Sequence, residues 1–365
     1  IFLIELKIKP KNMEPKNIAK DGFFIKKTHL NLKNTAFLSL TIALKAYFST
    51  YKSMKNKFSY LKKPDPDDEN QDYYSIKYIE NACEAVTHLQ HFLELYIKEI
   101  LENESILLAI DVKKNHSILY DIIKGYSYDK TKLEKERQLE FSESFQRVIS
   151  LIKTKRIDYS KYEFILDSKE WIETVNYLRN RIAHRGIFIL RYQALDFLFG
   201  KYVLPFVNEI IRLEGKENKF KTLEFYSNKG KLNVIDCITK HFEEEKYSIT
   251  KVALLKEFGR ACFENPVKEN IGLGRNEKER AEVIADEVSK QEDSGIVMKC
   301  PICRSHSLVK YHELVDLINK KTGDYDESIE IVYNVTCYCC SLELFNDLED
   351  IKIMNLGLED YWKND

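Results

Sequence analysis

The sequence lacks any run of apolar residues that approaches the ~18 residues of a membrane-spanning helix, although 44% of its residues are hydrophobic. It also lacks a signal-peptide core, because the opening apolar run Ile1–Ile4 is followed at once by Glu5 and Lys7. No long internal repeat is present. These absences exclude a membrane-spanning protein and predict a soluble, cytoplasmic globular protein of two or three domains.

Charge of both signs is present, and its distribution is uneven. The net charge of the whole chain is -1, but residues 1–63 carry 14 lysines against 3 acidic residues, which gives +11 and leaves about -12 for the rest. A basic N-terminal segment of this kind can contact the phosphate backbone of a nucleic acid. The alternative is a solvated, lysine-rich surface with no partner.

Apolar residues recur at helical spacing in most of the chain. The proline-rich acidic stretch at 63–69 predicts a break between the first two helices. Residues 113–160 are polar and are expected to form either a helix pair or an exposed insertion. Pro205 is expected to bend the last helix of the middle segment. Helices are expected over residues 36–54, 76–100, 169–184, 192–213, 249–263 and 277–290, and short strands from residue 296 onward.

Five of the eight cysteines fall within 41 residues, which favours metal binding over disulfides in a reducing compartment. Cys300 and Cys303 form one CxxC pair, and Cys337 and Cys340 form a second. Two such turns supply four thiolates for a tetrahedral Zn²⁺ ion, and the β-rich segment between them is long enough for a hairpin. The pattern predicts a small zinc ribbon. Because four cysteine ligands leave no open position for water, we expect the zinc to be structural.

The choice of ligands leaves two alternatives open. Cys339 can replace Cys340, and His306 can replace Cys303. The three cysteines outside the cluster lie in apolar helical patterns and are expected to be inert core residues: Cys83, Cys237 and Cys262.

A second candidate site lies at the end of the 169–184 helix. Arg179, Asn180 and His184 give the pattern R-N-x-x-x-H, which ends an amphipathic helix and precedes another long helix. Histidine suits proton transfer near neutral pH, and the arginine fork suits a phosphate that gains charge. On an ideal helix Arg179 and His184 lie ~140° apart, whereas Asn180 and His184 share a face. The arginine must therefore reach round the helix, or the last turn must be irregular.

This motif resembles the pattern R-[N/H/D]-x-x-x-H of the HEPN superfamily. The upstream stretch His88–Lys98 is similar to the first HEPN helix, which often carries a glutamate and a lysine one turn apart. The resemblance covers roughly residues 74–215. It implies a helical bundle, a homodimer or larger assembly in which two helix ends build one cleft, and metal-independent RNA cleavage with Arg179, Asn180 and His184 as the catalytic residues.

The resemblance also implies a biological role and a division of the chain. The expected role is that of a toxin or antiviral-defence effector, with RNA as substrate and a possible protein trigger bound through the zinc ribbon. The alternative is a non-catalytic nucleic-acid-binding or antitoxin-like adaptor, in which His184 only complements the helix dipole. His241, His306 and His312 lack such a context and are expected at the surface.

The expected fold class is therefore mainly α, with a HEPN-like helical bundle and a small C-terminal β zinc ribbon. The expected segments are a basic N-terminal helical segment (1–70), a HEPN-like helical domain (71–215), a helical connector (216–295), the zinc ribbon (296–345) and a C-terminal tail (346–365).

Overall fold

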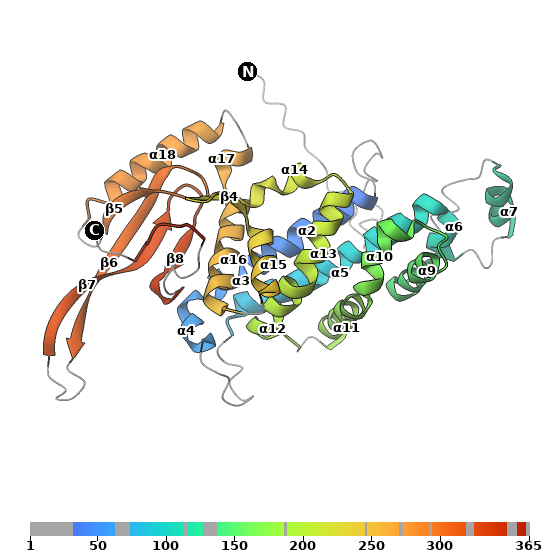
Figure 1. Cartoon of the computed structure of the whole chain (residues 1–365), viewed down its shortest axis with the longest axis horizontal. Coiled ribbons are helices and arrows are strands. Elements are labelled where there is room, and N and C mark those ends of the chain that lie inside the picture. The colour runs from blue at the N-terminus through green and yellow to red at the C-terminus, as the bar shows by residue number, and fades with distance from the viewer. Residues whose placement is uncertain are drawn as a thin grey trace, which may run out of the picture.

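The computed structural model describes residues 32–62, 74–111, 116–126, 137–185, 188–244, 247–269, 273–291, 294–318, 325–348 and 356–362. The chain is mainly α-helical, and a small antiparallel sheet near its C-terminus holds a cysteine cluster, as expected (Figure 1). Residues 1–31 of the basic N-terminal segment and the 63–69 break lie outside the described residues. Among those that are described, no helix combines the length and the apolarity needed to cross a lipid bilayer.

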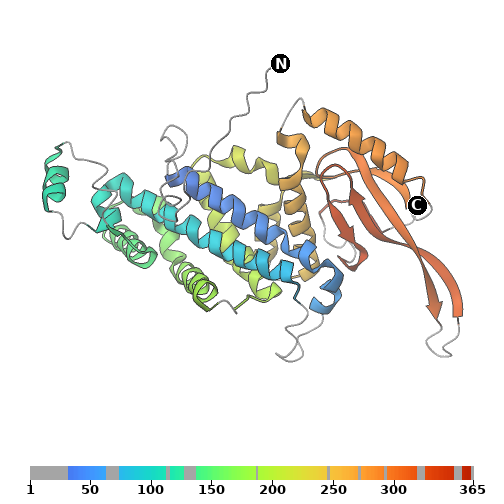
Figure 2. The same ribbon diagram turned by 180° about the vertical axis from the view of Figure 1, so that it is seen from behind.

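The centre of the helical part is an antiparallel pair, α2 (Leu32–Phe48) and α5 (Ile76–Glu104), which lie side by side in Figure 2. Ser75 caps α5 by accepting a hydrogen bond from the Tyr78 amide at 3.0 Å. The apolar stripe of α5 recurs every three or four residues over 29 residues, so one face of the helix is continuously buried. The expected helix at 36–54 divides instead, since α3 (Thr50–Met54) begins after a turn at Ser49.

Shorter helices cover the other faces of α5. In the described part of the segment at 113–160, α9 packs against α5, whereas α7 carries exposed residues such as Tyr120 and Ile123. Residues 113–115 and 127–136 lie outside the described residues. The elements on this side are α6 (Ile106–Ala109), β1 (Ile110–Asp111), α7 (His116–Lys124), β2 (Arg137–Gln138), α9 (Phe141–Lys153), α10 (Tyr159–Asp167) and α11 (Lys169–Arg185).

The expected bend at Pro205 takes the form of a wide helical turn. The chain runs as α12 (Tyr192–Phe197), a π-helical segment (Leu198–Val203) and α13 (Leu204–Leu213), with Pro205 in the first turn of α13. Proline has no N–H to donate to the preceding turn, which fits a change in hydrogen-bond register at this point.

The segment 216–295, expected to be a helical connector, also contains a β-hairpin. Its strands are β3 (Glu224–Ser227) and β4 (Gly230–Asn233), and α14 (Glu217–Phe220) precedes them. Helix α15 (Val234–Glu243) follows. His241 on α15 is only 5% exposed, so its expected surface position is wrong. The reason is that its ring packs inward and accepts a hydrogen bond from the Ser248 amide at 2.9 Å.

Helix α16 (Ile249–Glu264) is buried on nearly all sides and joins the helical part to the sheet. A Cβ on Gly259 would lie 2.6 Å from the Phe48 ring, so glycine permits the close approach of α16 to α2. Helices α17 (Pro266–Glu269) and α18 (Leu273–Val288) come next, and α18 covers one face of the sheet.

The C-terminal sheet has the order β5-β6-β7-β8, with every neighbouring pair antiparallel. Strands β6 and β7 are much longer than their outer neighbours and extend beyond them as a two-stranded ribbon (Figure 1). The strands are β5 (Ser294–Lys299), β6 (His306–Ile318), β7 (Tyr325–Cys337) and β8 (Glu343–Phe345).

Candidate metal centre and candidate active site

The first cysteine turn follows β5. The Cys300 amide donates to the Ser305 carbonyl at 2.9 Å, and the Arg304 amide donates to the Cys300 carbonyl at 3.1 Å. Arg304 has a positive φ of 63°, which lets the chain turn back into β6. The Ile302 amide points at Cys300 Sγ, 3.4 Å away. A backbone N–H directed at sulfur favours the thiolate form, which is the form that binds metals.

The second cysteine turn follows β7 and repeats this geometry. The Cys337 amide donates to the Leu342 carbonyl at 2.8 Å. Ser341, the residue after the second cysteine of this pair, has a positive φ of 57° and so matches Arg304 in the first turn. The two turns are therefore similar local structures at adjacent strand ends, as the two CxxC pairs predict.

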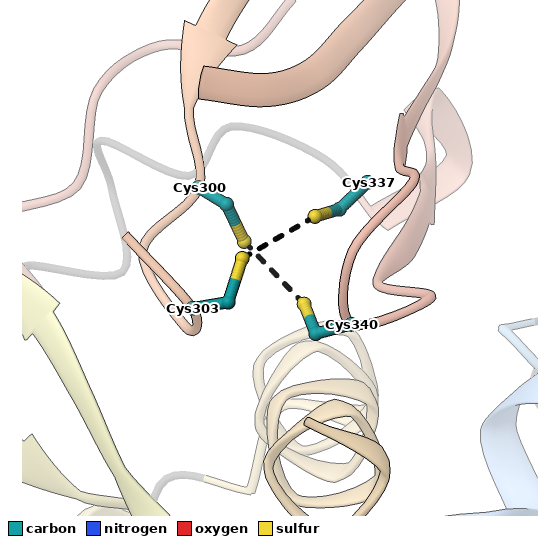
Figure 3. A group of neighbouring side chains, drawn as sticks. All are labelled: Cys300, Cys303, Cys337 and Cys340. Carbon is teal, nitrogen blue, oxygen red and sulfur yellow. Dashed lines mark hydrogen bonds between the residues drawn. The ribbon is translucent and has the colours of Figure 1, made fainter. Parts of the chain in front are cut away.

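The four cysteine sulfurs converge on one point, as Figure 3 shows for Cys300, Cys303, Cys337 and Cys340. All four sulfurs lie within 4.8 Å of one another, and the Cys300–Cys340 and Cys303–Cys337 sulfurs are 3.5 and 3.6 Å apart. A tetrahedral ion with ~2.3 Å metal–sulfur bonds requires sulfur–sulfur distances of ~3.8 Å. The donor set therefore fits a single tetrahedral metal ion that the protein surrounds completely.

The burial of the four cysteine side chains also indicates a metal site. All four side chains are buried, and burial raises the pKa values of the Cys300 and Cys340 thiols. A divalent cation among the sulfurs would supply the charge that stabilises the thiolates. The group of convergent donor atoms contains neither of the two alternative ligands, Cys339, which is half-buried, and His306, which is exposed.

Helix α16 holds the second cysteine turn through a buried charge network. Arg260, which is 3% exposed, donates from Nη2 to the Ser341 carbonyl at 2.5 Å and from Nη1 to Ser341 Oγ at 3.0 Å. The same guanidinium forms a fork with the Glu257 carboxylate, at 2.8 and 2.5 Å. Glu257 is fully buried and also accepts from the Glu343 amide at 2.9 Å. Charged hydrogen bonds thus fix the second cysteine turn to the helical part of the chain.

Two further elements support the first cysteine turn. The Tyr226 amide of β3 donates to the Pro301 carbonyl at 2.8 Å, and the Arg304 guanidinium lies 4.4 Å from the Tyr226 ring centroid. From α18, Glu282 accepts from the His306 amide at 2.9 Å and from Ser305 Oγ at 3.1 Å. Two elements that precede the sheet in the chain, β3 and α18, thus position the first cysteine turn.

The second candidate site lies at the C-terminal end of α11. The structure keeps α11 helical through Arg185, so the last turn is regular. Arg179 Nη1 donates to Asn180 Oδ1 at 3.0 Å, which turns the guanidinium toward the face that Asn180 shares with His184. Arg179 and Asn180 are half-buried and His184 is exposed. The regular last turn leaves the first of the two expected solutions, in which the arginine reaches round the helix toward His184, as a prediction.

Helix α5 packs beside α11 and contributes charged side chains. Lys98 Nζ lies 2.7 Å from Glu94 Oε1, one turn apart, and Gln90 donates to the other carboxylate oxygen at 3.2 Å. The pKa of His91 is lowered by burial and also by the nearby cations, Arg179 among them. His91 Nδ1 is 2.8 Å from Ser39 Oγ on α2. The charge of Arg179 thus acts on the polar side chains of α5, although it hydrogen-bonds to Asn180 on its own helix.

Arg181, between the motif residues, has a different role. Its guanidinium carbon lies 3.7 Å from the Phe188 ring centroid and 5.6 Å from that of Tyr177. Stacking on both rings holds the chain that follows α11 against the helix. Gly186, at the end of this helix, lies outside the described residues.

Sequence reasoning missed two buried charged groups in α16. One is the Arg260 network described above. The other is Lys256, whose Nζ lies 2.7 Å from Asp196 Oδ1, with both side chains fully buried. Burial lowers the pKa of Lys256 to about 8. Tyr247 donates to the same carboxylate at 3.0 Å. The sequence did contain one sign of these buried charges. Helix α16 is otherwise apolar on all faces, yet it carries an unusual number of charged residues.

Comparisons with models of protein families, with characterised proteins and with solved structures found no match for this chain.

Proposed function

We propose that this chain is a cytoplasmic endoribonuclease of the HEPN type that cleaves RNA without a catalytic metal and acts as a toxin or antiviral-defence effector. The observation that carries the proposal is the side-chain array at the end of α11. A half-buried arginine is turned by Asn180 toward the face that carries the exposed His184. A histidine and a cation at one surface can supply the proton transfer and the charge stabilisation that cleavage of a phosphodiester by 2′-OH attack needs.

The proposed chemistry assigns a role to each side chain. The ribose 2′-OH loses its proton and its oxygen attacks the adjacent phosphorus, while the bond to the 5′-oxygen breaks and that oxygen gains a proton. His184 transfers protons, and Arg179 stabilises the charge that develops on the phosphoryl oxygens. Asn180 orients the guanidinium. The products are a 2′,3′-cyclic phosphate and a 5′-hydroxyl.

The proposed assembly is a homodimer in which two α11 ends face each other. The reaction needs one proton removed and one delivered, and each chain brings one His184 to this surface. Two copies supply both groups. Sedimentation is expected to give a dimer or larger assembly at micromolar concentration, whereas an active monomer would contradict this arrangement.

For the metal centre we propose structural zinc, because four thiolates in a closed tetrahedral set match the preference of Zn²⁺. The ribbon then serves as a rigid support and as a surface for a partner. Since the four sulfurs fill all of its positions, the ion takes no part in the proposed reaction.

The test is RNA cleavage by purified variants. His184→Ala is expected to lose ~10²–10⁴-fold in rate, and Arg179→Ala a comparable factor. Arg179→Lys should recover only part of the rate, because an ammonium cannot reproduce the planar fork. The matched control is His116→Ala, an exposed histidine on α7, which should cut at the wild-type rate.

Two further measurements identify the mechanism. A substrate with one 2′-deoxy ribose at the cleavage position should resist cutting there, because the nucleophile is absent. Activity should survive EDTA for as long as the chain stays folded. If both alanine variants cut RNA as fast as wild type, the active site lies elsewhere. If the wild-type chain binds RNA but never cuts it, the non-catalytic adaptor is the correct alternative.

A further inference from the structure

The ribbon formed by β6 and β7 continues well beyond the rest of the sheet. Strand β5 pairs with β6 only as far as Tyr311, and β8 pairs with β7 only from Asn334 onward. Between these points, and within the part of the chain that the structure describes, β6 and β7 pair only with each other, up to Ile318 and Tyr325. We call residues 312–318 and 325–332 the β-arm. Figures 1 and 2 both show it projecting away from the helices.

The β-arm exposes apolar side chains that a sheet normally buries. Leu314 is 75% exposed, Ile318 62% and Tyr325 63%. An isolated two-stranded ribbon is marginally stable in water, and an exposed edge strand offers a row of outward N–H and C=O groups to another strand. These features favour a partner that adds to the edge of the arm and covers its apolar side chains.

The negative charge of the β-arm indicates which kind of partner can bind it. Its described residues include five carboxylates and no lysine or arginine: Glu313, Asp316, Asp326, Glu327 and Glu330. Residues 319–324 add two lysines and one aspartate, so the segment 312–332 carries six acidic and two basic side chains, a net charge of -4. Nucleic acid is repelled by such a surface, and so is the same arm of a second copy.

We propose that the β-arm is the docking site for another protein that presents an extended segment of alternating basic and apolar residues. Main-chain hydrogen bonds to the free edge supply part of the affinity. Apolar side chains of the partner cover Leu314 and Ile318, and its lysines or arginines pair with the carboxylates. This docking does not depend on RNA cleavage, so its test is independent of the proposed nuclease.

The probe is a fluorescein-labelled ten-residue peptide of alternating lysine and valine, titrated with the full-length chain and followed by anisotropy. Two peptides serve as controls, one with glutamate in place of lysine and one with glycine in place of valine. Wild type should bind the lysine–valine peptide at least tenfold more tightly than either control. A fluorescein-labelled single-stranded RNA oligonucleotide is titrated in parallel.

Two arm variants and one matched control locate the site. Neutralising the arm with Glu313→Gln, Glu327→Gln and Glu330→Gln, or making it polar with Leu314→Ser and Ile318→Ser, should each weaken peptide binding at least tenfold. The control neutralises three exposed carboxylates of α18, by Glu277→Gln, Glu279→Gln and Glu287→Gln, and should change binding less than twofold. Thermal melting and metal content verify that every variant is folded.

Four outcomes would overturn the proposal. The first is wild type with no preference for the lysine–valine peptide, and the second is an α18 control that loses as much binding as the arm variants. The third is loss of RNA binding in the arm variants, which would make the arm a nucleic-acid surface. The fourth is loss of self-association in the arm variants, measured by sedimentation, which would make the occupant a second copy of the chain.

Discussion

Replacing Arg260 by leucine should destabilise the protein more than any surface substitution, and should also loosen the metal. The guanidinium is 3% exposed and bonds to Glu257, Glu264 and Ser341 at once. Leucine fills part of the volume but leaves the fully buried Glu257 carboxylate without its cation. Breaking a buried pair on one side costs about 3–5 kcal/mol.

Protonation of Glu257 limits how much stability Arg260→Leu can lose, and a second variant can measure that limit. Burial raises the pKa of Glu257, and the hydrogen bonds from Arg260 oppose that effect. Without the arginine the carboxyl can take up a proton, which removes the uncompensated charge. A double variant with Glu257→Gln starts from this neutral state and keeps an acceptor for the Glu343 amide. It should recover about 2 kcal/mol relative to Arg260→Leu alone.

The assays are urea unfolding followed by circular dichroism and the rate of metal loss to a colorimetric chelator. Arg212→Leu is the matched control, because the Arg212 side chain is 73% exposed and its ion pair with Glu209 lies on the surface. That change should cost less than about 1 kcal/mol. If Arg260→Leu and Arg212→Leu have the same stability and the same rate of metal loss, the hydrogen bonds of Arg260 do not hold the second cysteine turn in place.

Three further outcomes are expected. The chain should bind about one metal ion, which Cys300→Ser loses and Cys339→Ser keeps, as measured by elemental analysis. Since burial lowers the pKa of His241 to about 4 from 6.5, the unfolded chain takes up a proton first as the pH falls, so up to about 3 kcal/mol of stability should be lost between pH 6.5 and 4. Thermal melts should show that His241→Gln removes this loss. Lys256→Met should cost about 3–5 kcal/mol in urea unfolding, and adding Asp196→Leu should restore most of it, because the pair is then replaced by apolar groups.

Helices with one continuous apolar stripe were predictable from the sequence. The expected helix at 76–100 corresponds to α5 (Ile76–Glu104), and that at 169–184 corresponds to α11 (Lys169–Arg185). The cysteine cluster was equally accessible, because a CxxC spacing fixes a local turn before any long-range packing forms. The apolar stripe of a helix and the CxxC spacing can both be recognised from residues that are close together in the sequence.

The missed features all depend on contacts between distant parts of the chain. Arg260 and Ser341 are 81 residues apart, and nothing near either one indicates that the arginine is buried. A charged residue on a helix is normally read as solvated. His241 was placed at the surface for the same reason, since its hydrogen-bond donor, the Ser248 amide, lies seven residues further along the chain, beyond the end of α15.

Helix α16 contacts both the helical part of the chain and the C-terminal sheet, and it couples the stability of the two. On one side Gly259 admits the Phe48 ring of α2, so α16 belongs to the helical core. From the same turn Arg260 holds Ser341, directly after the cysteine turn that brings Cys340 to the cluster. A metal ion bound by the four cysteines would order the cysteine turns, and the free energy of its binding would also fix the turn that receives Arg260. Such an ion would therefore stabilise the end of the helical part as well as the sheet, and α16 is the element that would transmit this effect.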